Sequence, residues 1–298
     1  MKNSKNKKFT CKGINNALAI LESNRFNILS IEILQNSRAD RHPRLKNLID
    51  NHLVSQFSKD QFWGLKLFCD MNSDQRKLYD SFLSTEVDSV KQLIEDKGFE
   101  KSRFHVLSLL TRLRQICCHP KLIDATLETE SEKMTILVNR LEQLAASNHK
   151  VVVFSQFVGV IDILKGKLNE LGLSYSVLTG RTKKRETAVE TFTKDPSVPI
   201  FLVSLKAGGV GLNLNVADYA FIYDPWWNPA VEKQAMDRIH RLGQKKAVFV
   251  YRLLMKDSIE EVIHLIQNKK SKILESLLLK EGELLSLIDN KEMKDLFV

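Results

Sequence analysis

The sequence is poor in cysteine and has no long apolar run. Its 298 residues include only Cys11, Cys69, Cys117 and Cys118, with no Cys-x-x-Cys pair. Adjacent cysteines bridge one another only with unusual geometry, which excludes a disulfide scaffold and favours reduced thiols in an intracellular protein. His119 follows them without the spacing of a zinc site, so we expect no metal. No stretch approaches the roughly 18 consecutive apolar residues of a membrane-spanning helix, and we expect no membrane partner.

The first residues also lack the pattern of a secretory signal. Residues 1–12 carry five lysines, and no apolar segment follows them. The composition, with 43% hydrophobic and 27% charged residues, is that of a globular protein and excludes wholesale disorder or a collagen.

The net charge of +9 suggests a polyanionic partner, most often nucleic acid, although solubility alone is an equal explanation. Residues 1–60 hold 11 basic and 5 acidic side chains, so +6 of the +9 lies there. The charge is therefore a weak marker of an active surface.

Residues 150–254 alternate short apolar segments with amphipathic ones. Predicted strands cover residues 151–154, 174–178, 200–204, 219–223 and 248–254, and predicted helices cover residues 158–171, 183–192 and 229–242. This order predicts an α/β fold with a parallel sheet and helices on both faces. Ligands bind such sheets beyond the carboxyl ends of the strands.

The flanking segments are predicted to be mostly helical. After a strand over residues 62–70, Ser73 or Asp74 is expected to cap a helix. A second helix over residues 102–117 ends before Pro120, and a closing helix covers residues 258–279. In the second helix a stripe is expected at Phe104, Leu107, Leu110 and Leu113, with Arg103, Arg112 and Arg114 off it.

Three polar side chains share a predicted helix face. Gln234, Arg238 and Arg241 are spaced four and three residues apart. A core does not readily bury two unpaired cations. They either form salt bridges with carboxylates, which the spacing alone favours, or clamp phosphate oxygens.

A glycine-rich loop follows the strand at residues 200–204. Gly208, Gly209 and Gly211 allow a close approach of the backbone to a ligand, or simply a tight turn. Leu214 stands where a dinucleotide-binding fingerprint needs a third glycine, which disfavours a dehydrogenase.

Together these segments resemble helicase motifs V and VI of the SWI/SNF-type, DNA-translocating ATPases of helicase superfamily two. The resemblance covers residues 62–280. It includes VFSQF at 153–157 (motif IV), LTGRT at 178–182, DPWWNP at 224–229, LRQICCHP at 113–120 (the signature helix) and DSIEE at 257–261 (the closing helix).

The family has two RecA-like lobes with ATP between them and DNA across both, and this sequence resembles only the second lobe. The one Gly-Lys pair, Gly166-Lys167, lacks the phosphate-loop context, and no Asp-Glu dipeptide occurs. The resemblance thus implies ATP with magnesium, held mainly by a first lobe absent from this chain. That lobe, in the same or a separate polypeptide, and double-stranded DNA are the implied partners.

The resemblance also assigns roles to residues. Arg238 and Arg241 would act as arginine fingers on the γ-phosphate, and Gln234 would orient them or a water. Gly209 and Gly211 would let motif V sense the nucleotide.

Contacts to DNA are expected at phosphates, because a translocase ignores sequence. Arg181, Ser204 and Lys206 are the candidates. Trp226 and Trp227 are expected to pack locally.

These features divide the chain into four parts. They are an unassigned basic segment at 1–60, a helical linker and signature region at 61–125, a RecA-like helicase C-terminal domain at 126–257, and closing helices and a tail at 258–298. We predict the second lobe of a DNA-dependent ATPase, inactive in isolation. The alternative is a non-enzymatic DNA- or protein-binding module that kept the fold. The expected location is the bacterial cytoplasm, or the nucleus in a eukaryote.

Overall fold

The computed structural model describes residues 65–205, 207, 212–226, 229–239, 248–265 and 267. All of them lie within one compact unit of the chain. The strands are β1 (Leu65–Cys69), β2 (Val151–Ser155), β3 (Tyr175–Leu178), β4 (Ile200–Ser204), β5 (Tyr219–Ile222) and β6 (Phe249–Met255). The helices are α4 (Ser73–Lys97), α5 (Phe99–Cys118), the short 3-10 helix η2 (Pro120–Leu122), α6 (Glu132–Ala146), α7 (Val158–Glu170), α8 (Arg185–Lys194) and α9 (Pro229–Met236).

The described strands form one parallel sheet in the order β1-β6-β5-β2-β4-β3. Strand β2 lies in the centre, where Val151 pairs with Ile200 of β4 and with Tyr219 of β5. The predicted parallel α/β sheet is confirmed. Because every strand runs the same way, the segments that follow β2, β3, β4 and β5 all lie at one edge of the sheet.

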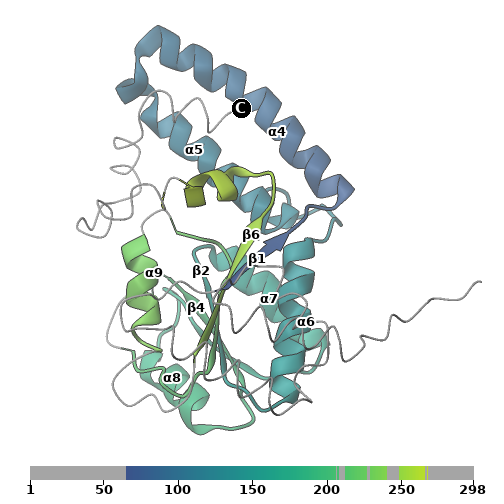
Figure 1. The fold of residues 1–298 in the computed structure, drawn as a ribbon, viewed down its shortest axis with the longest axis vertical. Helices are drawn as coiled ribbons and strands as arrows, with labels where there is room; N and C mark the ends of the chain where they lie inside the picture. The colour runs from purple at the N-terminus through teal and green to yellow at the C-terminus, as the bar shows by residue number, and fades with distance from the viewer. Residues whose placement is uncertain are drawn as a thin grey trace, which may run out of the picture. The chain divides into compact units, whose positions relative to one another are not determined.

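Helices cover both faces of the sheet (Figure 1). Helices α6 and α7 pack on the face that carries Val151 and Val153. Helices α8 and α9 lie on the other face, where Phe192 of α8 stacks on Phe201 of β4 at 5.0 Å. All five residues of β2 are buried, which explains why its sequence is continuously apolar rather than alternating.

Two predicted details near the start of the described region are wrong. Helix α4 is capped by Asn72, whose side-chain oxygen accepts a hydrogen bond from the Gln75 amide at 2.9 Å, and not by Ser73 or Asp74. The expected apolar stripe of α5 is also displaced, because Phe104 is 78% exposed. The buried apolar side chains of α5 are Val106, Leu109, Leu110, Leu113, Ile116, Cys117 and Cys118.

Helix α6 was not predicted. It buries Met134, Leu137 and Leu141 against the sheet, a spacing of three and four residues that is typical of an amphipathic helix. Among the described residues, no helix combines the length and apolarity needed to cross a bilayer.

Candidate functional site

A buried carboxylate lies at the edge where the strands end. Asp224 follows β5 and is completely buried. It accepts hydrogen bonds from the hydroxyl of Ser155, at the end of β2, and from the Gln156 amide at 2.9 Å. Asp224 therefore joins the segments that follow two neighbouring strands.

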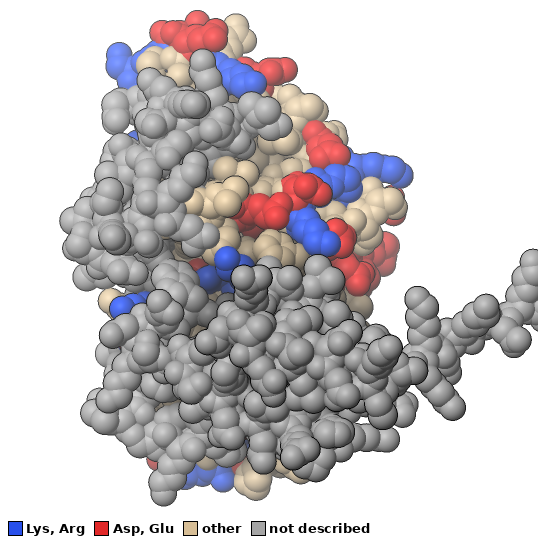
Figure 2. Space-filling view, in the orientation of Figure 1, with Lys and Arg blue, Asp and Glu red and all other residues tan. Residues whose placement is uncertain are grey.

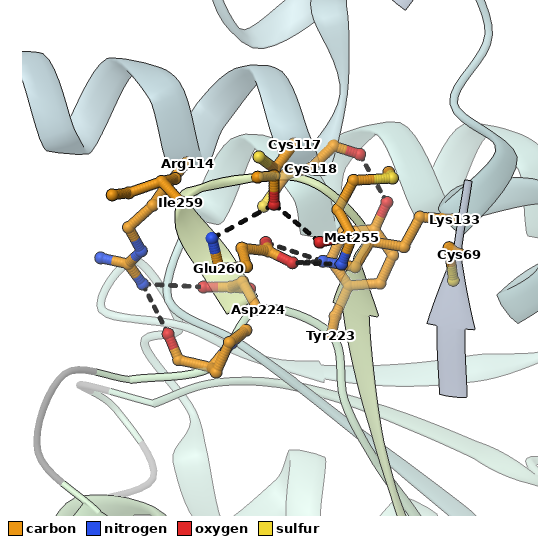
Figure 3. A network of polar contacts seen from close by, with 12 residues as sticks. Cys69, Arg114, Cys117, Cys118, Lys133, Tyr223, Asp224, Met255, Ile259 and Glu260 are labelled. Atoms are coloured by element: carbon orange, nitrogen blue, oxygen red, sulfur yellow. Dashed lines mark hydrogen bonds and ion pairs between the residues drawn. The ribbon is translucent and has the colours of Figure 1, made fainter. Parts of the chain in front are cut away.

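Arg114 of α5 reaches the same place from outside the sheet (Figure 3). Its Nη2 donates to the side-chain oxygen of Gln156 and to the carbonyl of Pro225, both at 2.8 Å, and lies 3.9 Å from a carboxylate oxygen of Asp224. The guanidinium also stacks over the Phe157 ring at 5.5 Å. The prediction that Arg114 lies off the buried side of its helix is wrong, because the side chain is completely buried.

Burial raises the pKa of Asp224 to about 7, although Arg114, Ser155, the Gln156 amide and Lys133 all favour its charged form. The folded chain therefore holds a proton on Asp224 at pH values where the unfolded chain, with the usual aspartate pKa of 3.8, has released it. The contribution of this pKa difference to the free energy of unfolding is complete below pH 3.8, the pKa in the unfolded chain. It is lost as the pH rises through about 7, the pKa in the folded chain.

We accordingly expect the free energy of unfolding of the chain to fall, relative to that of Asp224→Asn, between about pH 4 and about pH 7. Asparagine keeps the shape and an acceptor oxygen but does not titrate in this range. Urea unfolding at several pH values measures the difference. Parallel pH profiles for the two proteins would rule out a raised pKa at Asp224.

A second buried network joins α6 to the segment after β6 (Figure 3). The ammonium group of Lys133 contacts both carboxylate oxygens of Glu260 at 2.8 and 2.6 Å, and both side chains are completely buried. The Met255 amide donates to the same carboxylate at 2.9 Å. Residues 259–265 are helical, so this ion pair fixes the described part of the predicted closing helix to the domain.

The cysteines near this network are free thiols in the interior. Cys69, Cys117 and Cys118 are unbridged and at most 1% exposed, and burial raises the pKa of each. The Cys118 carbonyl accepts a hydrogen bond from Tyr223 at 2.6 Å. Within the described ranges no three His, Cys, Asp or Glu side chains are placed to hold a metal ion.

Contacts of α9 attach the segment that carries the predicted arginine fingers to the sheet. Glu232, 2% exposed, accepts a hydrogen bond from the Trp226 amide at 2.6 Å and pairs with Arg252 of β6. Gln267, in the closing helix, donates to the Trp226 carbonyl. Trp226 is half-buried and packs against the core, as expected, and Trp227 lies outside the described residues.

The single helix predicted over residues 229–242 is wrong, because α9 ends at Met236. Arg238 lies in the turn that follows, and its carbonyl accepts a hydrogen bond from the Leu214 amide at 3.0 Å. Its side chain is half-buried, whereas Gln234 is exposed on α9. The two residues therefore do not share one continuous helix face, and Arg241 lies outside the described residues.

The other predicted site residues are placed as follows. Arg181 follows β3 and is exposed, with its guanidinium 3.8 Å from a carboxylate oxygen of Asp162. Ser204 ends β4 and is 2% exposed, which leaves little of its side chain available for a phosphate contact. Lys206, Gly209 and Gly211 lie outside the described residues, and their roles stay predictions.

Basic side chains do not form a single patch on the described surface that Figure 2 shows. Lysines and arginines are interspersed there with aspartates and glutamates. On α4, likewise, Arg76 pairs with Asp80 and Lys77 with Asp74. The described surface in this view therefore offers no basic face from which to argue a DNA contact.

Sequence reasoning missed the residues that hold the site together: Arg114, Ser155, Gln156, Asp224, Glu232 and Arg252. All except Arg252 lie in or beside the segments that carry the resemblance, at 113–120, 153–157, 224–229 and 234–241. Their clustering in these segments was the signal in the sequence that could have identified them. The partners of each residue were not visible, because they come from distant parts of the chain.

Residues 132–243 match the family model described as "Helicase conserved C-terminal domain". An uncharacterized ATP-dependent helicase of Mycoplasma pneumoniae is 36% identical over 85% of this chain and 24% of its own length. The SWI/SNF-related matrix-associated actin-dependent regulator of chromatin subfamily A member 1 of Homo sapiens is 34% identical over 78% of this chain and 23% of its own length. The chain thus spans about a quarter of these curated relatives.

Solved structures show the same fold. The SWI2/SNF2 ATPase C-terminal domain of Sulfolobus solfataricus superposes with a TM-score of 0.63 and 26% identity, over 78% of this chain and 96% of that domain. The ATPase core from the same organism in complex with dsDNA gives a TM-score of 0.66 over 96% of this chain and 60% of that chain, and its 20% identity supports the fold alone.

Proposed function

This chain belongs to the SNF2-type helicases, as their C-terminal lobe, and we propose that it supplies arginine side chains to a nucleotide held by a first ATPase lobe. Arg238 and Arg241 would stabilise the charge that develops on the transferring phosphoryl group. Gln234 would orient an arginine or a water molecule. Hydrolysis would drive the two lobes along double-stranded DNA.

The observation that supports this proposal best is the contact between motifs V and VI. The Leu214 amide at the end of the motif V segment donates to the Arg238 carbonyl at 3.0 Å. Arg238 is half-buried and follows a helix that the buried ion pair of Glu232 with Arg252 fixes to the sheet. An arginine held on a rigid support can stabilise a transition state without a large reorganisation.

ATP with magnesium fits this chain only in part. The described residues offer Arg238 as a cation for phosphate, but no cluster of three ligands for a metal ion, and the sequence lacks a phosphate loop and an Asp-Glu pair. In the proposal the first lobe holds the metal and most of the nucleotide. The ATP dependence in the name of the Mycoplasma pneumoniae relative supports ATP as a substrate of the complete protein.

We expect Arg181→Ala to weaken binding to duplex DNA equally for unrelated sequences. The slope of log Kd against log salt concentration should fall by about one unit, because one phosphate contact is lost. Arg181 is suited to this role because its side chain is 81% exposed at the end of β3, and its ion pair with Asp162 is long. Fluorescence anisotropy with labelled duplexes over a salt series measures the slope.

The matched control for Arg181 is Lys194→Ala. Lys194 is also exposed, pairs with Glu190 on its own helix α8, and carries the same charge. It should leave the salt slope unchanged. Equal effects of the two substitutions, or a loss confined to one DNA sequence, would contradict a phosphate contact at Arg181.

The alternative function is a non-enzymatic DNA- or protein-binding module with the same fold. Such a module has the same sheet and buried networks, but Arg238 and Arg241 have no role in hydrolysis. Addition of a first lobe to this chain separates the two proposals. Only if this chain is the second ATPase lobe should it change the rate at which the added first lobe hydrolyses ATP.

A further inference from the structure

Three buried side chains from outside residues 224–232 hold that segment in place. Arg114 of α5 donates to the Pro225 carbonyl at 2.8 Å and lies beside Asp224. Arg252 of β6 holds Glu232, which in turn accepts from the Trp226 amide. Gln267 donates to the Trp226 carbonyl. Figure 3 shows Arg114 and Asp224 pointing toward one another above the sheet.

Arg114 links this segment to the α4–α5 hairpin, whereas Arg252 links it to the sheet and Gln267 links it to the helix after β6. Helix α5 packs against α4, and together they form a helical hairpin that lies between β1 and α6 in the sequence. A hydrogen-bonded guanidinium at this position transmits a displacement of α5 directly to the Pro225 carbonyl. A planar fork with several donors suits such a junction better than an ammonium group.

We infer that Arg114 is a positioning residue for motif VI, which couples the α4–α5 hairpin to the placement of α9 and Arg238. This inference rests on the proposed function, since it gives Arg238 a geometry that matters for hydrolysis. Arg114 holds the carbonyl of Pro225, which precedes α9 (Pro229–Met236), and the Leu214 amide holds the carbonyl of Arg238, which follows it. With both ends fixed, a shift at Arg114 changes the position from which Arg238 acts.

The physical consequence differs from that of a merely structural ion pair. Above about pH 7, where Asp224 is charged, removal of Arg114 leaves a buried carboxylate unpaired, which lowers stability whatever the function of the pair. Removal of both charges together relieves that penalty but does not restore the hydrogen bond to Pro225. Stability and positioning can therefore be separated in one set of variants.

The test uses Arg114→Met alone and combined with Asp224→Asn, with Asp224→Asn alone and Arg112→Met as controls. Arg112 is exposed on the same helix. Hydrogen exchange of the Trp226 amide, which donates to Glu232, measures how often the segment opens in this chain. We expect exchange to be at least about tenfold faster in the double variant than in Asp224→Asn, and Arg112→Met to behave as the unmodified chain. Equal exchange in the double variant and Asp224→Asn would overturn the inference.

Hydrolysis supplies the second readout, with each variant assembled with a matching first lobe. We expect the double variant to regain the unfolding midpoint lost in Arg114→Met while kcat stays roughly 10- to 100-fold low and KM for ATP is unchanged. If kcat recovers together with stability, Arg114 is only structural. If the unmodified assembly shows no DNA-stimulated hydrolysis, the proposed function fails, and the exchange result still decides whether Arg114 positions the segment.

Discussion

Substitution of Arg238 by alanine, in an assembly of this chain with a matching first lobe, is expected to lower kcat for DNA-stimulated ATP hydrolysis by about 10³- to 10⁵-fold. The KM for ATP should change little, because a finger acts on charge that develops only in the transition state. Steady-state assays with saturating duplex DNA measure both constants. Arg238→Lys keeps the charge but not the planar fork, so we expect it to restore only part of the rate.

Lys233→Ala is the control for Arg238. Lys233 is exposed on α9 and its substitution removes the same charge from the same segment. It should retain the kcat of the unmodified assembly. A similar loss in both variants would mean that general electrostatics, and not a finger at Arg238, accounts for the effect.

The isolated chain is expected to show no DNA-stimulated hydrolysis above the background of the buffer. It lacks a phosphate loop to hold the triphosphate and the Asp-Glu pair that binds magnesium. A matching first lobe should raise turnover by at least roughly 10³-fold over either part alone, because the finger contributes on that scale. Phosphate release, measured for each part and for the mixture, tests this expectation.

The same mixture with Arg238→Ala in this chain is the matched control, and it should remain near the rate of the first lobe alone. Substantial turnover by the isolated chain would contradict the account of a dependent lobe. A mixture no faster than the first lobe alone would favour the binding-module alternative.

The sheet was predictable because its central strands are buried on both faces. Strand β2 is five buried residues long, and such a strand requires a continuous apolar run that is visible without any tertiary information. The strand at 200–204 is also buried throughout, and the strand at 219–222 is buried except at the half-buried Tyr219. Their parallel direction follows from the helices between them, since a parallel pair needs a long crossover.

The end of α9 was not predictable from local periodicity. The pattern of Gln234, Arg238 and Arg241 continues a helical spacing beyond Met236, where the helix stops. The Arg238 carbonyl bonds to the Leu214 amide instead. The C-terminal end of α9 is therefore set by a backbone contact with another part of the chain, and no residue within the helix predicts it.

Arg114 was misplaced for a related reason. Arginine is usually exposed, so an arginine beside an apolar stripe is assigned to the surface by default. Its acceptor at Pro225 lies 111 residues further along the chain. Only the fold brings the signature helix, the segment after β2 and the segment after β5 to one point.

The most direct measurement for the central claim is the affinity of the two-lobe assembly for ADP–aluminium fluoride, a mimic of the phosphoryl-transfer transition state, compared with its affinity for ADP. A residue that binds the transition state more tightly than the ground state should affect only the first of these. We predict that Arg238→Ala weakens the mimic by at least about 100-fold and leaves ADP unchanged. Equal affinity of the mimic for the variant and the unmodified assembly would contradict the claim that this chain supplies an arginine finger.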